Sequence, residues 1–137
     1  MVTSLVTAIL AHFNSVDVGS PSGRELVHRV AQFVHCLAQG KVGSGFDVSA
    51  ATFGSQKYTR FNSKILQRCL DTAEAKNKNL NHVICDNEML DVLITDLDLD
   101  TLRGSNIGNK WDHKNTLFQL PTGFNLFVAD VDQGSNT

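Results

Sequence analysis

A short glycine-rich segment, residues 39–51, has the residue types best suited to chemistry on a phosphate group. It contains glycines at positions 40, 43 and 45, with Lys41 beside them and Asp47 just after them. Glycine lets the backbone turn tightly and presents N–H groups to a ligand. Oriented N–H groups, one cation and one carboxylate together suit phosphoryl transfer. Several unrelated folds use glycine-rich loops, so the loop alone does not identify a family.

The charged residues in and near this segment each allow two interpretations. Asp47 follows the glycines at an expected helix N-terminus, where the helix dipole favours an ionised carboxylate; it is either a catalytic residue or a simple first-turn acid. Lys41 is either a cation that meets a phosphate or a solvated lysine at a helix C-terminus. Arg60, on the next predicted strand, either grips a phosphate or remains an edge-strand surface charge.

The flanks of the segment are more specific than its glycines. The block from His35 to Phe61 closely resembles the eukaryotic phosphomevalonate kinases, members of the galactokinase, homoserine kinase, mevalonate kinase and phosphomevalonate kinase superfamily. The resemblance continues weakly through residues 110–113 and 134–137, so it covers nearly the whole chain. It implies ATP-dependent phosphorylation of 5-phosphomevalonate to 5-diphosphomevalonate, in isoprenoid and sterol precursor synthesis, with ATP and Mg²⁺ as cofactors.

The resemblance also implies which residues form the site. Asp47 and Lys41 are the implied catalytic residues. The implied substrate-binding residues are Gln39, Lys41, Gly43, Ser44, Gly45 and Arg60. Because the acceptor would be a phosphate that is already largely ionised at neutral pH, catalysis should depend on positioning and cations more than on a general base. Asp47 is then expected to orient the acceptor, to position Mg²⁺ through water, or to tune a neighbouring lysine.

The resemblance further implies an incomplete domain. Residues 1–137 are expected to form part of a kinase N-terminal domain, with residues 1–10 as the body of the helix that follows the Gly-Leu-Gly-Ser-Ser-Ala loop for the ATP phosphates. That loop and the C-terminal domain are expected to be missing, and the chain alone is therefore expected to be inactive. The alternative is a non-catalytic truncated remnant, or a module that binds a phosphate or a protein partner.

Composition narrows the class of protein. With 137 residues, 42% of them hydrophobic and 19% charged, the chain suits one globular domain. A net charge of −2 without a basic block argues against binding to nucleic acid or anionic membranes. No apolar run reaches the ~18 residues of a membrane-spanning helix, and residues 1–11 lack the basic flank of a signal peptide. The three widely spaced cysteines favour reduced thiols and a cytoplasmic protein. The oligomeric state stays open.

No metal site is predicted. His28 and His35 are seven residues apart on one predicted helix, too far to share an ion, and we expect core or interface histidines. Aspartates at 96, 98 and 100 imitate the start of a calcium loop, but positions 101 and 107 lack the required glycine and glutamate. Residues 111–113 are expected to pack and to cap a neighbouring element.

The hydrophobic pattern predicts an α+β fold with a mixed sheet and helices packed on it. Helices are predicted at 2–13, from a Ser22–Glu25 capping box to about Gly40, at 46–53 and at 64–75. The first of them is apolar on nearly every side, which predicts burial. Strands are predicted at 57–61, 116–120 and 125–131, the last two split by a turn at 121–123. Residues 82–102 suit either a helix or an alternating strand.

Overall fold

The structure is a computed structural model of the chain, and it describes residues 1–13, 16–75, 92–93 and 111–127. The elements in chain order are α1 (Val2–His12), α2 (Pro21–Gln39), α3 (Phe46–Phe53), β1 (Gln56–Thr59), α4 (Lys64–Ala75) and β2 (Lys114–Leu117). The α+β class is confirmed, and α3 and α4 have the bounds that the sequence predicts. The ambiguous stretch at 82–102 and the acidic repeat at 96–107 lie outside the described residues, apart from helical Val92 and Leu93.

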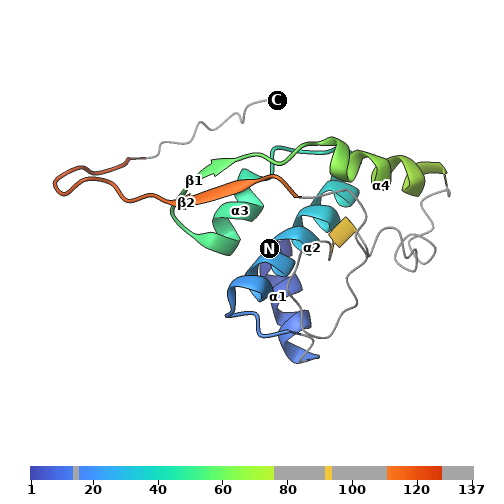
Figure 1. Cartoon of the computed structure of the whole chain (residues 1–137), viewed down its shortest axis with the longest axis horizontal. Coiled ribbons are helices and arrows are strands. Elements are labelled where there is room, and N and C mark those ends of the chain that lie inside the picture. Colours follow the sequence, from blue (N-terminus) through green and yellow to red (C-terminus); the bar gives the residue numbers. More distant parts are fainter. Residues whose placement is uncertain (14–15, 76–91, 94–110, 128–137) are drawn as a thin grey trace.

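Helix α2 is the centre of the fold. It packs against α1 and α3, and it also packs against α4 (Figure 1). One apolar cluster joins α1, α2 and α3; its members are Val6, Val27, Ala31 and Val48. A second cluster joins α2 to α4 and to the segment before β2; its members are Phe33, Cys36, Phe61, Ile65, Leu66, Cys69, Leu70, Leu93 and Trp111. Since α2 contributes to both clusters, its side chains are held in place on two sides.

The start of α2 differs from the predicted capping box. The N-cap is Ser20, whose Oγ accepts a hydrogen bond from the Gly23 N–H at 3.0 Å, and Pro21 takes the first helical position. Proline suits that position because its φ is already helical and its missing N–H would have no partner there. The helix therefore begins before Ser22, and Glu25 pairs with Arg29 and His113 instead of closing a capping box.

Helix α1 is only partly buried, so the prediction of a buried helix was wrong for part of its surface. Thr3 and Val6 are its buried residues, whereas Leu5 and Ile9 are 61% and 47% exposed. The helix meets α2 and α3 along one face, and this contact covers only part of an apolar surface that runs all round it. Sequence hydrophobicity correctly identified the helix but overstated how much of it these neighbours cover.

Within the described residues the sheet is one pair of antiparallel strands, and the parallel pairing of the predicted mixed sheet is not found among them. Gln56 lies opposite Leu117, and Thr59 lies opposite Lys114. Both strands are shifted toward the N-terminus relative to the predicted 57–61 and 116–120, while the alternation of burial along β1 is confirmed. A strand extends as far as its backbone can pair with a neighbouring strand. A hydrophobic pattern in the sequence gives these end points only approximately.

The segment before β2 has the predicted packing and capping roles. Trp111 is 4% exposed in the second cluster, and its indole Nε1 donates to the Val92 carbonyl at 2.8 Å. The Asp112 Oδ1 accepts a hydrogen bond of 2.7 Å from the Asn62 N–H, just before α4. This segment therefore ties the strand pair to both α2 and α4.

Residues 118–127 extend away from the helices as an apolar arm (Figure 1). The predicted turn is present, with the Phe124 N–H donating to the Pro121 carbonyl at 3.1 Å. Residues 125–127 are not a strand, so that part of the predicted strand was wrong, and the rest of it lies outside the described residues. The side chains of Phe124, Leu126 and Phe127 are 69–90% exposed. No helix in the described part of the chain is both long and apolar enough to cross a membrane.

Candidate functional site

The glycine-rich loop begins where α2 ends in a Schellman motif. Gly40 has φ 65° and ψ 18°, in the left-handed region that glycine adopts at little cost. The Gly40 N–H donates to the Leu37 carbonyl, and the Lys41 N–H donates to the Cys36 carbonyl at 3.2 Å. This pairing closes the helix and sends the chain directly into residues 41–45. The position of Lys41 at the mouth of the loop is therefore fixed by the helix end.

Gly45 is required at the other end of the loop. It has φ 76° as the N-cap of α3, and a Cβ added there would lie 2.5 Å from the Gln32 Oε1. Gln32 is fully buried in α2, and its Nε2 contacts the Cys36 sulfur at 3.3 Å. Only a residue without a side chain allows the loop to approach α2 this closely. The third glycine of the motif is thus explained by packing as well as by backbone conformation.

Two side chains, one from β1 and one from the residue that follows it, also hold the loop. The Tyr58 hydroxyl donates to the Ser44 carbonyl at 3.3 Å, and the Arg60 guanidinium donates to the Val42 carbonyl at 3.1 Å. Burial raises the pKa of Tyr58, so its hydroxyl stays a donor at neutral pH. Side chains two residues apart on an extended segment lie on the same face, which is why both reach the loop. The Arg60 side chain thus contacts the backbone of the loop.

These contacts orient the loop's N–H groups. In a trans peptide the N–H points opposite to the C=O, so the N–H groups of Gly43 and Gly45 point away from Arg60 and Tyr58. Within the described residues no hydrogen bond uses either N–H, and no side chain caps α3. Unpaired N–H groups at a helix start attract an anion. Hydrogen bonds to its carbonyl groups therefore hold the loop in place, and its N–H groups stay available as donors to a ligand.

Asp47 lies in the first turn of α3, beside a histidine from α2. Its Oδ2 is 3.5 Å from the His35 Nε2, and the two side chains are 52% and 25% exposed. The helix dipole stabilises the carboxylate there, and a protonated His35 would add to that stabilisation. The two side chains lie against each other at the edge of the loop. Asp47 is thus held in position and remains accessible to a solute.

The other predicted residues also lie around this loop. Lys41 is exposed, and no ion pair involves it within the described part of the chain. Gln39 is the last residue of α2, with its Oε1 3.6 Å from the Cβ position of Gly43. Ser44 is exposed and contributes its carbonyl to the contact with Tyr58. The seven predicted site residues therefore belong to the loop or to its immediate supports.

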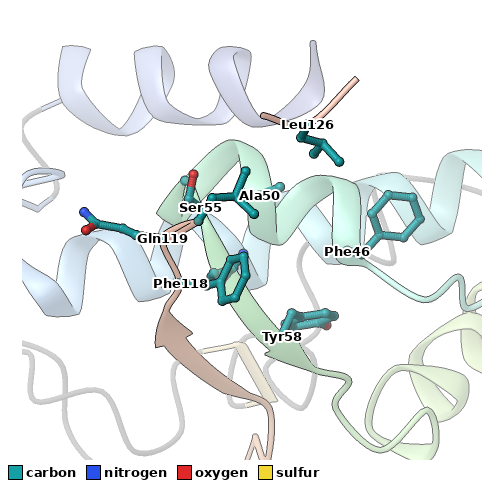
Figure 2. Close-up of a pocket in the computed structure, with 10 residues that line it drawn as sticks. Phe46, Ala50, Ser55, Tyr58, Phe118, Gln119 and Leu126 are labelled. Carbon is teal, nitrogen blue, oxygen red and sulfur yellow. The ribbon is translucent and has the colours of Figure 1, made fainter. Parts of the chain in front are cut away.

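A separate pocket lies on another face of α3. Figure 2 shows it between α3, which carries Phe46 and Ala50, and Tyr58 of β1 with Phe118, the residue just after β2. Its volume is about 550 Å³, and its lining is mainly apolar. None of the seven predicted site residues lines it. The apolar pocket and the charged loop are distinct features that share α3 and β1.

Three supports of the site were not among the predicted site residues. His35 was expected in the core or an interface, and its spacing of four from Gln39 left open that it approaches the loop. Tyr58 had the alternation signal that it shares with Arg60. Gln32 gave no signal, since a buried glutamine on an apolar helix face shows its role only when the chain folds back on it.

Comparison with known proteins gives one consistent relationship. The chain is 36% identical over 145 residues to the peroxisomal phosphomevalonate kinase of Arabidopsis thaliana, and this match covers all of the chain and 25% of the relative. It is 34% identical over 139 residues to a phosphomevalonate kinase of Aspergillus fumigatus, and 31% identical over 138 residues to that of Candida albicans. The matches cover 25% and 27% of those relatives.

The chain spans about a quarter of the length of these curated relatives. No protein-family model and no solved structure matches it. Plant and fungal sequences nevertheless agree with it along its full length, and the region that they share includes the braced glycine loop. The chain is therefore related, over its whole length, to about a quarter of the phosphomevalonate kinase sequence.

Proposed function

We propose that this chain is part of an ATP-dependent kinase that converts 5-phosphomevalonate to 5-diphosphomevalonate, and that its glycine loop binds the acceptor phosphate. The supporting relatives are named as phosphomevalonate kinases. The observation that carries the assignment to the loop is its geometry. Carbonyl contacts hold the loop, and it leads from Lys41 into the uncapped N-terminus of α3 beside Asp47.

The proposed reaction joins two anions. It forms a bond between a phosphate oxygen of 5-phosphomevalonate and the γ-phosphorus of ATP, and it breaks the bond from that phosphorus to the oxygen that leaves with ADP. The main obstacle is repulsion between the two phosphate groups, so positioning and positive charge should supply most of the rate. Lys41 and the N–H groups of the loop are the donors that meet this need.

In this proposal the negatively charged side chain of Asp47 lies close to the negatively charged acceptor phosphate. A carboxylate beside a dianion is unfavourable unless a cation balances it. His35, at 3.5 Å, supplies that balance when protonated. We propose that Asp47 acts as an orienting group for the acceptor and for Lys41, and that His35 fixes the direction of the carboxylate. Proton abstraction is a minor requirement because the acceptor oxygen is already ionised near neutral pH.

ATP and Mg²⁺ are the cofactors that this reaction requires. The sequence from His35 to the start of α3 contains one carboxylate, that of Asp47. Its exposed oxygens fit a Mg²⁺ ion that keeps most of its water ligands. When bound, Mg²⁺ would neutralise charge on the transferred group. The protein's own part is to hold the acceptor and to keep Lys41 and Asp47 at the mouth of the loop.

Two measurements on the purified protein test this function. Titration with 5-phosphomevalonate, followed by amide NMR, should shift the backbone signals of residues 41–47. Incubation with Mg²⁺-ATP and 5-phosphomevalonate, followed by ³¹P NMR, should show no diphosphate above background for this chain alone and should show it for a complete kinase that contains this segment. Equal shifts with unphosphorylated mevalonate would contradict the assignment of the loop to phosphate.

We propose the cytoplasm as the compartment, in keeping with the reduced thiols expected from the sequence. The Arabidopsis relative is named as peroxisomal, which makes the peroxisome the alternative to test. A fluorescent fusion viewed beside markers of both compartments distinguishes them, and co-localisation with the peroxisomal marker would overturn the cytoplasmic assignment.

A further inference from the structure

A second cluster of polar side chains lies away from the glycine loop. Glu25 and His28 come from α2, three residues apart on one face, and His113 comes from the segment just before β2. One ligand atom from each residue lies within 4.8 Å of the others. The Glu25 Oε2 and His113 Nε2 are 3.2 Å apart. Two ligands of a tetrahedral zinc ion with bonds of about 2.0–2.1 Å are separated by about 3.3 Å.

The histidines of this cluster are buried without enough partners. His28 is 0% exposed, and within the described residues neither of its ring nitrogens has a hydrogen-bond partner. The Nδ1 of His113 is also buried without a partner. The rings around His28 are those of Phe53, Tyr58, Trp111 and His113. Orphaned buried nitrogens each cost about 1–3 kcal/mol, so the cluster calls for an additional binding partner.

The residue types of the cluster suit a metal ion. Zinc takes carboxylate oxygens and imidazole nitrogens as ligands, and Glu25, His28 and His113 supply one carboxylate and two imidazoles at a common point.

We propose that Glu25, His28 and His113 together bind one Zn²⁺ ion, in a site that goes beyond the kinase function. Two imidazoles and one carboxylate are borderline ligands that suit zinc, and three protein ligands leave a fourth position for water. The Glu25 side chain is 20% exposed, which gives that water a route from solvent. The ion would join α2 to the segment before β2, across 88 residues of sequence.

Arg29 both supports and limits the site. It donates to the Glu25 Oε1 at 2.9 Å, which leaves Oε2 directed toward His113. A hydrogen bond to the second oxygen is a common way of orienting a carboxylate ligand. The positive charge of Arg29 also opposes a cation, so we expect weaker binding than at a site built of cysteine thiolates.

Metal titration of the purified, chelator-treated protein tests this proposal. Zn²⁺ followed by calorimetry, and Co²⁺ followed by its visible absorption, should show one saturable site at neutral pH. Glu25→Gln and His113→Gln should each weaken binding by about 100-fold or more, because removing a ligand costs at least as much as removing its supporting group. The matched control is His12→Gln, at the C-terminal end of α1, which should bind as the wild type does.

If either variant fails to fold, a measurement on the wild-type protein still tests the proposal. Long-range ¹H–¹⁵N spectra of the imidazole rings should shift for His28 and His113 on addition of Zn²⁺, while His12 stays unchanged. The absence of a saturable 1:1 site, or shifts confined to other histidines, would overturn the proposal. Unaltered affinity in folded Glu25→Gln and His113→Gln would overturn it equally.

Discussion

Two histidines of α2, only seven residues apart, have opposite environments. His28 is fully buried among four aromatic rings, with a pKa of about 4, and contacts the cluster of Glu25 and His113. His35 is 25% exposed and pairs with Asp47 at the glycine loop. The same residue type on the same helix thus belongs to two different sites. Neighbours brought by the fold, rather than position on the helix, decide what each histidine can do.

The two regions also differ in how they are built. The glycine loop is made of residues close together in sequence, from Gln39 to Asp47, and Tyr58 of β1 and Arg60 just after β1 contact it. The cluster at His28 needs His113, which arrives from the far end of the described chain. The loop should therefore depend on its backbone geometry, and the cluster on the docking of one distant segment.

The largest expected effect is at the loop. Asp47→Asn keeps the shape of the side chain and removes its charge, so in a complete kinase that contains this segment kcat should fall about 10²-fold, as for the loss of an orienting group, while KM changes far less. Steady-state kinetics with 5-phosphomevalonate measures this split. A kcat within about twofold of the wild type would make Asp47 a simple first-turn acid.

The buried cluster should dominate the dependence of stability on pH. In metal-free protein, His28 has a folded pKa of about 4 against 6.5 when unfolded, so the unfolded state binds more protons between these values. Stability is then complete above pH 6.5 and is lost as the pH falls to about 4, by about 3 kcal/mol. The lowered pKa of Glu25 extends the loss from about pH 4.5 toward 2.

Urea unfolding at a series of pH values checks this prediction. His28→Gln should remove the loss between pH 6.5 and 4, whereas the His12→Gln control should keep it. A wild-type stability that does not change over that interval would contradict the buried, neutral state of His28.

Substitution of two loop glycines distinguishes the stability cost of backbone strain from the cost of a steric contact. Gly40 and Gly45 both have positive φ, but a Cβ at Gly40 meets nothing within 4 Å, whereas one at Gly45 meets Gln32. Gly40→Ala should cost about 1 kcal/mol of stability from backbone strain alone, and Gly45→Ala about 2–3 kcal/mol. Thermal or urea unfolding measures both. Equal losses would show that contact with Gln32 is unimportant.

The smallest effect is expected at His35. A partly exposed ion pair contributes about 0–1 kcal/mol, so His35→Asn should lower kcat/KM no more than about fivefold. The measurement is kcat/KM for 5-phosphomevalonate at neutral pH in the complete kinase that contains this segment. A loss as large as that of Asp47→Asn would assign His35 a direct catalytic role and end its interpretation as a positioning residue.

Sequence alone predicted the local features well. The bounds of α3 and α4 agree because a glycine, a capping residue and helical spacing all act within a few residues. The glycine loop was found for the same reason. The start of α2 was misplaced because Ser20-Pro21 and Ser22-Gly23 offer competing caps, and proline decides between them only through its fixed φ.

Contacts between distant segments could not be predicted from the sequence. No pattern connects His113 to Glu25 or Gln32 to Gly45, since each contact depends on how elements pack. The exposure of α1 was also unpredictable, because hydrophobicity tells which surface prefers burial but not whether a neighbour covers it. The seven predicted site residues do lie around one loop, whereas their catalytic roles remain predictions.

The most direct test of the acceptor-site proposal is the affinity for 5-phosphomevalonate, measured by calorimetry in the wild type, Lys41→Met and Lys57→Met. Lys57 is an exposed lysine on β1 that has no predicted role in the site, so it controls for loss of charge. A charge-assisted contact contributes about 1.5–3 kcal/mol, so Lys41→Met should weaken binding about 10- to 150-fold and Lys57→Met hardly at all. Equal affinities in all three proteins would contradict the account, because the loop would then make no charged contact with the acceptor phosphate.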